Sequence, residues 1–210
     1  VEPNTITYNA AVSACEKGGF WMPALHLLRE ISDSRVERNT ITYSAALSAC
    51  EKGGQWWHAL QLVHDMVADG VERNSVTCNA AISACENGRQ WGLALQFFRE
   101  MADSHVEKSA ITYTAVVGSC EKGGQWWRAL QLLREMANNH VEMDSIACNA
   151  AISACDQGRQ WWQALHLLSN MEDRRVERNT ITSSAVVSAC EKGGQLWQAS
   201  SGIQRVLLAF

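Results

Sequence analysis

The sequence predicts an all-α fold, a right-handed α-solenoid superhelix of six 35-residue helix-turn-helix repeats. Cys15 recurs at every 35th residue as far as Cys190, without insertion or deletion, and Val1 recurs in the same way. Within each period, apolar residues follow helical spacing. A fixed period of this size indicates one unit stacked on copies of itself, so function is expected on a repetitive surface. We expect a single array over residues 1–210, with repeats at 1–35, 36–70, 71–105, 106–140, 141–175 and 176–210.

The second repeat shows the pattern of the first helix in each unit. Apolar residues at i, i+3, i+4 and i+7 predict a helix from roughly residue 40 to 52: Tyr43, Ala46, Leu47 and Cys50. Gly53 and Gly54 are expected to end it, because glycine adopts the left-handed conformation that helix ends favour. A short polar residue that suits an N-cap precedes each first helix: Asn4, Asn39, Asn74, Ser109, Asp144 and Asn179.

The second helix follows the glycine turn, from roughly Gln55 to Ala68. Its apolar positions are Ala59, Leu60, Val63 and Met66. Tryptophan opens this helix in five repeats and is expected to seal one repeat against the next: Trp21, Trp56, Trp91, Trp126 and Trp161. About 12 helices are predicted in all. The last repeat degenerates after Trp197, where Ser200, Ser201 and Gly202 replace an apolar run.

The composition argues against several classes of protein. Six of the eight cysteines lie one repeat apart with no close pair, so we interpret them as buried core residues in a reducing compartment, not as disulfide or metal ligands. No apolar run approaches the roughly 20 residues of a membrane span. The net charge of −4 argues mildly against a nucleic-acid ligand. No catalytic, cofactor or metal motif occurs, so we expect no enzyme activity, cofactor or small-molecule substrate. Val1 lies in phase with the repeat, which suggests a fragment of a longer chain.

A polar stripe runs along the first helix, opposite the apolar one. In the second repeat it consists of Ser44, Ser48 and Lys52, which are spaced by four and therefore aligned. Its counterparts are Asn9, Ser13 and Lys17 in the first repeat and Thr114, Gly118 and Lys122 in the fourth. The stripe is expected to face the concave side of the superhelix, with cations along one edge.

The words ITYNAAVSACEKGG and WRALQLLREM, repeated with this period, resemble the pentatricopeptide repeat family, as a fragment of a P-type array. Tetratricopeptide repeats run 34 residues and carry a different signature. The resemblance implies a protein that binds single-stranded RNA in a chloroplast or mitochondrion, although this chain shows no targeting segment. The resemblance also allows for an effector region outside this chain, through which protein partners could bind.

The resemblance further implies that each repeat reads one base with two side chains. The first group lies in the first helix and comprises Asn9, Ser44, Asn79, Thr114, Asn149 and Ser184. Their partners, just ahead of the next first helix, are Asn39, Asn74, Ser109, Asp144 and Asn179, with none left for the sixth repeat. Amides and hydroxyls can both donate to and accept from a base edge. By the family's preferences the pairs would read an RNA of the form Y-A-C-G-Y, with G assigned to Thr114 and Asp144.

Two further roles follow from the resemblance. Branched aliphatic residues would sandwich bases between repeats: Ile6, Ile41, Val76, Ile111, Ile146 and Ile181. Lysines at the end of the first helix would contact phosphate: Lys17, Lys52, Lys122 and Lys192. Asn87 and Gln157 depart from this pattern, so weaker phosphate contact is expected in repeats three and five.

Structural explanations remain open for each group. The partner residues suit N-caps, the lysines suit helix C-termini, and the aliphatic residues suit packing between repeats. Three interpretations of the whole chain follow: a sequence-selective RNA-binding protein in organellar RNA processing, stability or translation, a scaffold that holds a peptide in the same groove, or a decaying array without a tight ligand.

Overall fold

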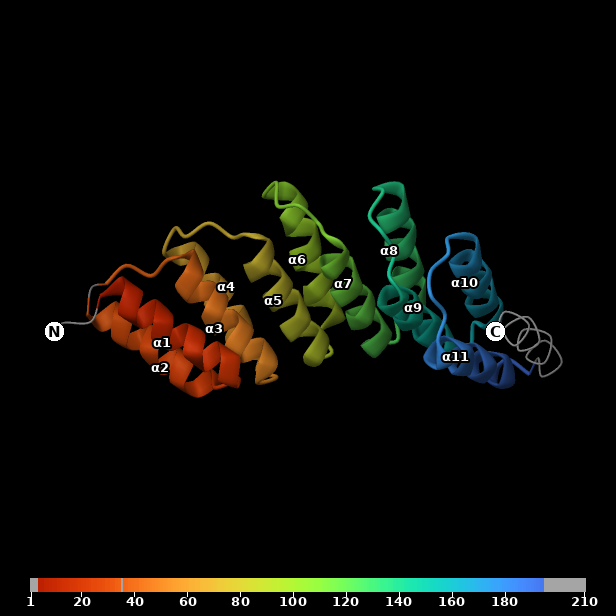
Figure 1. Ribbon diagram of the computed structural model, residues 1–210, viewed down its shortest axis with the longest axis horizontal. Helices are drawn as coiled ribbons and strands as arrows, with labels where there is room; N and C mark the ends of the chain where they lie inside the picture. Colours follow the sequence, from red (N-terminus) through yellow and green to blue (C-terminus); the bar gives the residue numbers. More distant parts are fainter. Residues whose placement is uncertain (1–3, 35, 195–210) are drawn as a thin grey trace. The chain divides into compact units, whose positions relative to one another are not determined.

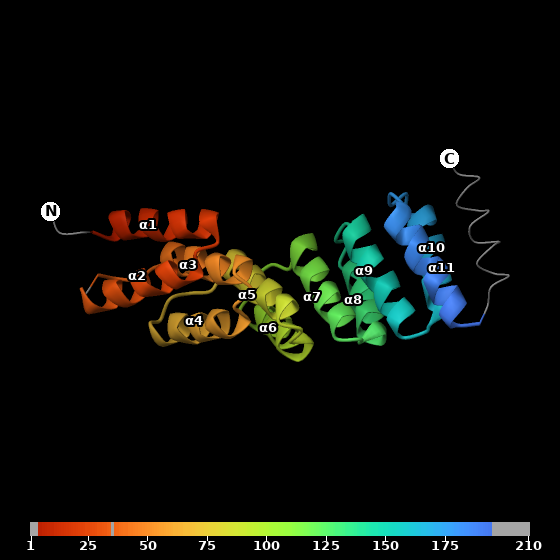
Figure 2. The same ribbon diagram turned by 90° about the horizontal axis from the view of Figure 1, so that it is seen from below.

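The computed structural model describes residues 4–34 and 36–194, and within these residues the chain is entirely helical. Each of the first five repeats is a pair of helices joined by a short turn (Figures 1 and 2). The second helix of the sixth repeat, with the predicted degeneration after Trp197, lies outside the described residues. The all-α helical-repeat solenoid predicted from the sequence is confirmed.

The chain divides into two compact units, Val1–Lys108 and Ser109–Phe210. The first unit holds α1 (Thr5–Gly18), α2 (Trp21–Asp33), α3 (Thr40–Lys52), α4 (Trp56–Ala68), α5 (Ser75–Asn87) and α6 (Trp91–Asp103). The second unit holds α7 (Ala110–Lys122), α8 (Trp126–Asn138), α9 (Ser145–Gln157), α10 (Trp161–Asp173) and α11 (Thr180–Lys192). The predicted bounds of α3 and α4 are therefore correct to within one residue.

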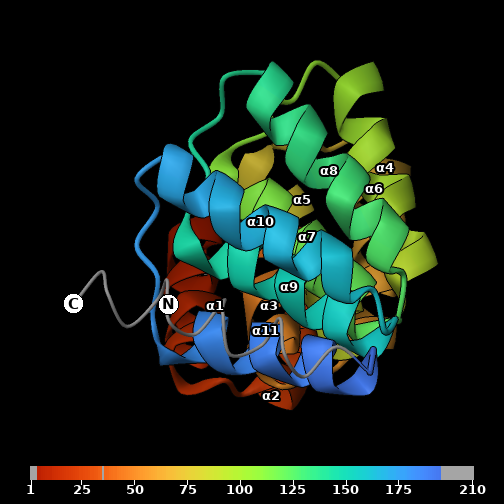
Figure 3. The same cartoon turned by 90° about the vertical axis from the view of Figure 1, so that its right-hand side faces the viewer.

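Both units have two layers of helices. In the first unit α1, α3 and α5 pack side by side, and in the second α7, α9 and α11 do the same. Figure 3 shows α9 and α11 in this arrangement. Each second helix packs against the first helix of its own repeat and, within a unit, against the first helix of the next. A first helix inside a unit therefore has neighbours on more sides, and α3 buries seven of its residues against four for α4.

The first helices meet through small side chains. Ala46, Ala49 and Cys50 of α3 are fully buried, as are their counterparts in α5. All the repeated cysteines from Cys50 to Cys190 are buried and unpaired, as the sequence predicts. Cys15 is only partly buried, so its predicted burial is wrong. Among the described helices, α1 packs against α2 and α3, so it is covered on fewer sides than α3 or α9.

The tryptophans that open α2, α4, α8 and α10 each pack against a glycine of the next repeat. A Cβ atom placed on Gly53 would lie 2.5 Å from Cδ1 of Trp21, and one on Gly158 would lie 2.5 Å from Cδ1 of Trp126. Real Cβ atoms do not approach so closely, so the indole needs glycine there. Trp56 and Trp161 contact Gly88 and Gly193 in the same way. These tryptophans therefore seal neighbouring repeats against each other, as predicted.

The second glycine of each turn has a different reason. Gly54, Gly124 and Gly194 have φ of 66°, 68° and 72°, and open space surrounds them. Left-handed backbone favours glycine because it lacks a Cβ atom. The first glycine is thus required by close packing and the second by the backbone angle, although the sequence assigned the left-handed turn to both.

Candidate nucleic-acid interface

The six residues expected just before the first helices are N-caps. Asn39 and Asn74 adopt extended backbone, and their side chains accept hydrogen bonds from the amides of Thr42 and Thr77 at 3.0 Å and 2.9 Å. Asp144 accepts from the Ala147 amide at 2.7 Å. Asn4 and Asn179 make the equivalent bonds, and the Ser109 amide donates to the Thr112 hydroxyl at 3.2 Å. Each of these residues therefore satisfies a helix end in the described structure.

The first predicted base-reading residues lie in the second turn of the first helices, and their side chains reach the caps of the following repeat. In the first unit, the Thr42 hydroxyl contacts Oδ1 of Asn9 and, at 2.9 Å, Oδ1 of Asn39. In the second unit, the Thr182 hydroxyl lies 2.6 Å from Oδ1 of Asn149 and 3.1 Å from Oδ1 of Asn179. A buried threonine therefore connects the two members of each Asn-Asn pair.

This threonine was not singled out from the sequence. Its signal was present, because threonine occupies the third helical position in five of the six repeats: Thr7, Thr42, Thr77, Thr112 and Thr182. The hydroxyl engages the carbonyl oxygen of the reading asparagine. Each asparagine therefore keeps amide protons for other partners: the Asn149 amide donates one to Oδ1 of Asn179 at 3.5 Å, and its second N–H can donate to a ligand.

The fourth repeat departs from this arrangement because Ala147 stands where the other repeats have threonine. The Thr114 hydroxyl lies 3.5 Å from both carboxylate oxygens of Asp144, so these two predicted readers meet directly. Asp144 also lines an open polar cleft of about 490 Å³ with residues that include Glu142, Arg174 and Arg175. The cleft leaves room for a polar ligand beside the carboxylate.

The serines at the first reading position use their hydroxyl protons within their own helices. Ser44 donates to the Thr40 carbonyl at 2.7 Å, and Ser184 donates to the Ile181 carbonyl at 3.0 Å. Toward a ligand they consequently present acceptor lone pairs, in contrast to the asparagines. Asn79 lies in the first unit and its predicted partner Ser109 in the second.

All six predicted base-sandwiching residues are exposed. Their exposed fractions are 78% for Ile6, 60% for Ile41, 53% for Val76, 68% for Ile111, 65% for Ile146 and 65% for Ile181. Packing between repeats does not bury these side chains. Their β-branched shape makes each a stiff apolar surface next to an N-cap.

Two of the predicted phosphate-contacting lysines, Lys52 and Lys192, are tied to the repeat before them. Lys52 Nζ lies 3.2 Å from the Glu16 carbonyl oxygen and 3.5 Å from its carboxylate. Lys192 Nζ lies 2.6 Å from the Asp156 carboxylate. Both lysines remain about half exposed, so these pairs hold the ammonium groups without removing them from solvent.

In the third and fifth repeats, which lack this lysine, neutral side chains contact the glutamate of the preceding repeat: Asn87 at the lysine position, and Ser153 four residues before it. Asn87 donates to the Glu51 carbonyl at 3.3 Å, and Ser153 donates to the Glu121 carboxylate at 2.6 Å. Burial raises the pKa of Glu51, which the hydrogen bond from Ser83 opposes. Glu16, Glu51, Glu121 and Asp156 each lie near the end of a first helix. Each contacts a side chain of the next repeat, whether that side chain is lysine or a neutral residue.

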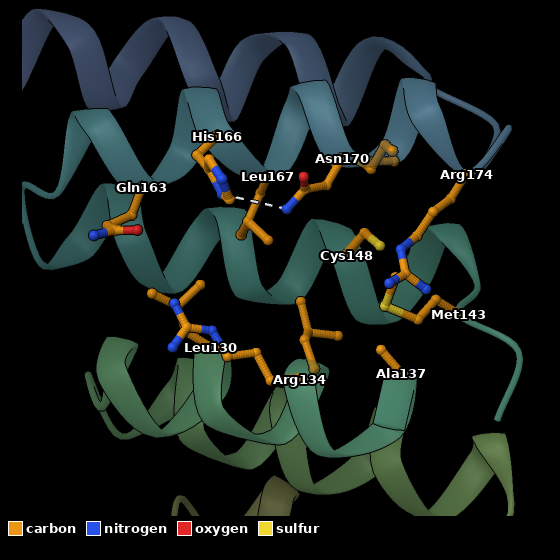
Figure 4. Close-up of a pocket in the computed structure, with 12 residues that line it drawn as sticks. Leu130, Arg134, Ala137, Met143, Cys148, Gln163, His166, Leu167, Asn170 and Arg174 are labelled. Atoms are coloured by element: carbon orange, nitrogen blue, oxygen red, sulfur yellow. Dashed lines mark hydrogen bonds between the residues drawn. The ribbon is translucent and has the colours of Figure 1, made fainter. Parts of the chain in front are cut away.

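A separate small pocket of about 90 Å³ lies between α8 and α10 in the second unit (Figure 4). Leu130, Leu167 and Cys148 form part of its lining, and His166 and Asn170 lie 3.3 Å apart at its edge. None of the predicted reading residues lines it. Across residues 4–34 and 36–194, no group of three His, Cys, Asp or Glu side chains is placed to hold a metal ion. No helix in this part of the chain has the length and apolar character of a membrane span.

Sequence comparison decides the family. The profile described as "Pentatricopeptide repeat domain" matches residues 61–122 and 131–192, and the "PPR repeat" profile matches residues 6–36, 41–71 and 111–141. The chain belongs to the pentatricopeptide repeat family. A comparison with curated proteins gave no match.

Solved pentatricopeptide repeat structures share this fold. The maize pentatricopeptide repeat protein PPR10 is 24% identical, with a TM-score of 0.69 over 98% of this chain. PPR10 in complex with an 18-nucleotide psaJ RNA element is 22% identical, with a TM-score of 0.76 over 95% of this chain. The chain spans 30% and 29% of the length of these two structures. The repeat domain of Arabidopsis thaliana protein-only RNase P 1, in complex with tRNA, is 15% identical, with a TM-score of 0.75 over 86% of this chain and 95% of that domain.

Proposed function

We propose that this pentatricopeptide repeat chain binds single-stranded RNA and selects its sequence, as part of organellar RNA processing, stability or translation. The observation that carries the proposal is the meeting of side chains about 30 residues apart in sequence, seen at Asn149 with Asn179 and at Thr114 with Asp144. Each pair presents donors and acceptors from two consecutive repeats at one place. Such a pair can contact the edge of one unpaired base.

The exposed aliphatic row supports the same proposal. Within each unit three branched side chains recur at one position, Ile6, Ile41 and Val76 in the first and Ile111, Ile146 and Ile181 in the second, and all are exposed. Exposed apolar residues arranged in a row are typical of a binding surface. Flat bases between them would cover this surface, while the N-cap pairs beside them contact the base edges. The structures of family members with an RNA element or tRNA add to the argument.

The paired lysines favour a second candidate, a groove that holds a peptide. Lys52 and Lys192 are partly neutralised by Glu16 and Asp156, which lowers the positive potential available for phosphates. A protein ligand would not require that potential. We rank it second, because pairs of partly buried or exposed polar side chains with varied identity are not needed to bind an extended peptide backbone.

Fluorescence anisotropy with a labelled single-stranded RNA that contains UACGU tests the proposal. We expect tighter binding to this RNA than to a scrambled strand of the same composition, and weak binding to its duplex. Asn149→Ser should shift the preference at the fifth base from pyrimidine toward purine. Asn138→Ser makes the same change at the exposed end of α8 and should have no effect. Equal affinity for duplex and single strand would rule out base reading.

A further inference from the structure

Every repeat carries one cation in the turn between its two helices, but at one of two positions. Repeats with the sequence Lys-Gly-Gly place it at the last residue of the first helix, as at Lys52. The third and fifth repeats instead read Asn-Gly-Arg and Gln-Gly-Arg, so the cation stands two residues later, at Arg89 and Arg159. Loss of the lysine is therefore accompanied by gain of an arginine in both repeats.

The backbone at these arginines is unfavourable for any residue except glycine. Arg89 and Arg159 have φ of 56° and 54°, whereas the equivalent Gly54, Gly124 and Gly194 have similar angles without a Cβ atom. A left-handed conformation is uncommon for residues other than glycine, asparagine and aspartate. Glycine would thus suit the fold better than arginine at both positions.

Packing does not compensate for this conformation. A Cβ atom placed on Gly54 or Gly124 would have no heavy atom within 4 Å, so the position opens to solvent. Arg89 and Arg159 are accordingly exposed. Their side chains make no hydrogen bond or ion pair within residues 4–34 and 36–194. Lys52 and Lys192, in contrast, are each held by an acidic residue of the preceding repeat.

We propose that Arg89 and Arg159 contact RNA phosphates in the third and fifth repeats, where the family's lysine is absent. This assignment rests on the proposed RNA-binding function. A guanidinium group with all its donors free can form two parallel hydrogen bonds to one phosphate. The sequence alone predicted weaker phosphate contact in these two repeats, and the proposed arginine contacts would replace that prediction. Six turns would then supply six cations.

The salt dependence of RNA binding distinguishes the two expectations. Each phosphate contact on a single strand contributes roughly −0.7 to the slope of log K against log salt concentration. Four lysines alone give a slope of about −3, and six cations give about −4. We would measure this slope by anisotropy on the full chain, with the matched and the scrambled RNA. The variant is Arg89→Gly/Arg159→Gly, because glycine is the residue that repeats two, four and six carry there.

The expected result is a fall in the size of the slope by about 1.4 for both RNAs, with unchanged preference between them. Arg89→Lys/Arg159→Lys should keep the slope of the wild type. Arg99→Gln/Arg134→Gln removes two exposed charges from the second helices and controls for net charge. A slope change no larger than that control would overturn the phosphate assignment, while base selection by the wild type would still stand. If the wild type bound no single-stranded RNA, the proposed function and this assignment would both fail.

Discussion

The hydroxyl of Thr182 lies 2.6 Å from Oδ1 of Asn149, which belongs to the preceding repeat. It also accepts a 3.2 Å hydrogen bond from the backbone amide of Asn179, the N-cap of α11. One buried hydroxyl thereby joins the helix cap to the side chain predicted to read a base. Helix stability and the proposed base selection consequently depend on the same hydroxyl oxygen.

Thr182→Val should weaken both properties. It removes the hydroxyl while keeping the branched shape, and we expect a loss of about 1 kcal/mol in the free energy of unfolding. Freed from Thr182, the Asn149 amide can rotate, so the preference for a pyrimidine at the fifth base should fall. Denaturant titration and anisotropy measure the two effects. Thr180→Val, at an exposed residue two positions earlier, is the control, and an equal loss in both variants would contradict the assignment.

Asp144→Asn should change selectivity with little change in stability. An ionised carboxylate accepts from the N1–H and amino group of guanine, whereas adenine cannot donate in the same way. We expect a shift from G toward A at the fourth base of about 1 kcal/mol. Asparagine remains a good N-cap, so the unfolding free energy should move by less than about 0.5 kcal/mol. A stability change with unaltered preference for G would leave Asp144 with a capping role alone.

Gly158→Ala should destabilise the second unit through Trp126. The added methyl group would meet the indole at 2.5 Å, and we expect a cost of about 1–3 kcal/mol from overpacking. Gly124→Ala instead meets open space, and its cost of about 1 kcal/mol arises from the positive φ. A smaller side chain in Trp126→Leu should reduce the cost of Gly158→Ala. Additive effects of these two substitutions would show that the indole is not the cause.

Cys15 should react with a thiol reagent well before the other repeated cysteines. It is partly exposed, while Cys50, Cys85, Cys120, Cys155 and Cys190 are buried. Mass spectrometry after brief labelling under native conditions at neutral pH should find one fast site, and denaturant should expose the rest. Simultaneous labelling of Cys15 and Cys85 would disagree with the packing of the first helices.

Alkaline pH should destabilise the fold through its buried thiols. Burial raises the pKa of Cys50, Cys120 and Cys148 to about 11 and that of Cys85 and Cys155 to about 12. In the unfolded chain these thiols ionise near pH 8.5, so between that pH and their folded values the folded state binds more protons. Stability is therefore fully present below about pH 8.5 and falls as pH rises, by about 1.4 kcal/mol per pH unit for each thiol.

Thermal unfolding from pH 8 to 10.5 measures this dependence. Cys85→Ala removes one titrating group and should make the dependence shallower, although it also lowers stability at every pH. A melting temperature that stays constant across this range would contradict the expected linkage.

The repeat by itself determined most of the fold. The 35-residue period, the helical spacing of Tyr43 and Cys50, and the cap at Asn39 were sufficient to place α3 correctly, because these signals act within a few residues of each other. The same local chemistry indicated that glycine ends each first helix. Resemblance to a family supplied the candidate reading residues, which local spacing could not connect.

The contacts between repeats could be identified only from the tertiary structure. The need for glycine at Gly158 comes from an indole 32 residues away, and the partner of Lys192 is an acid 36 residues before it. The position of Thr182 between two asparagines likewise depends on the neighbouring repeat. So does the partial burial of Cys15, whose helix α1 packs on α2 and α3. Nearly identical repeats carry nearly identical local signals, so the differences between them arise from what packs on each side.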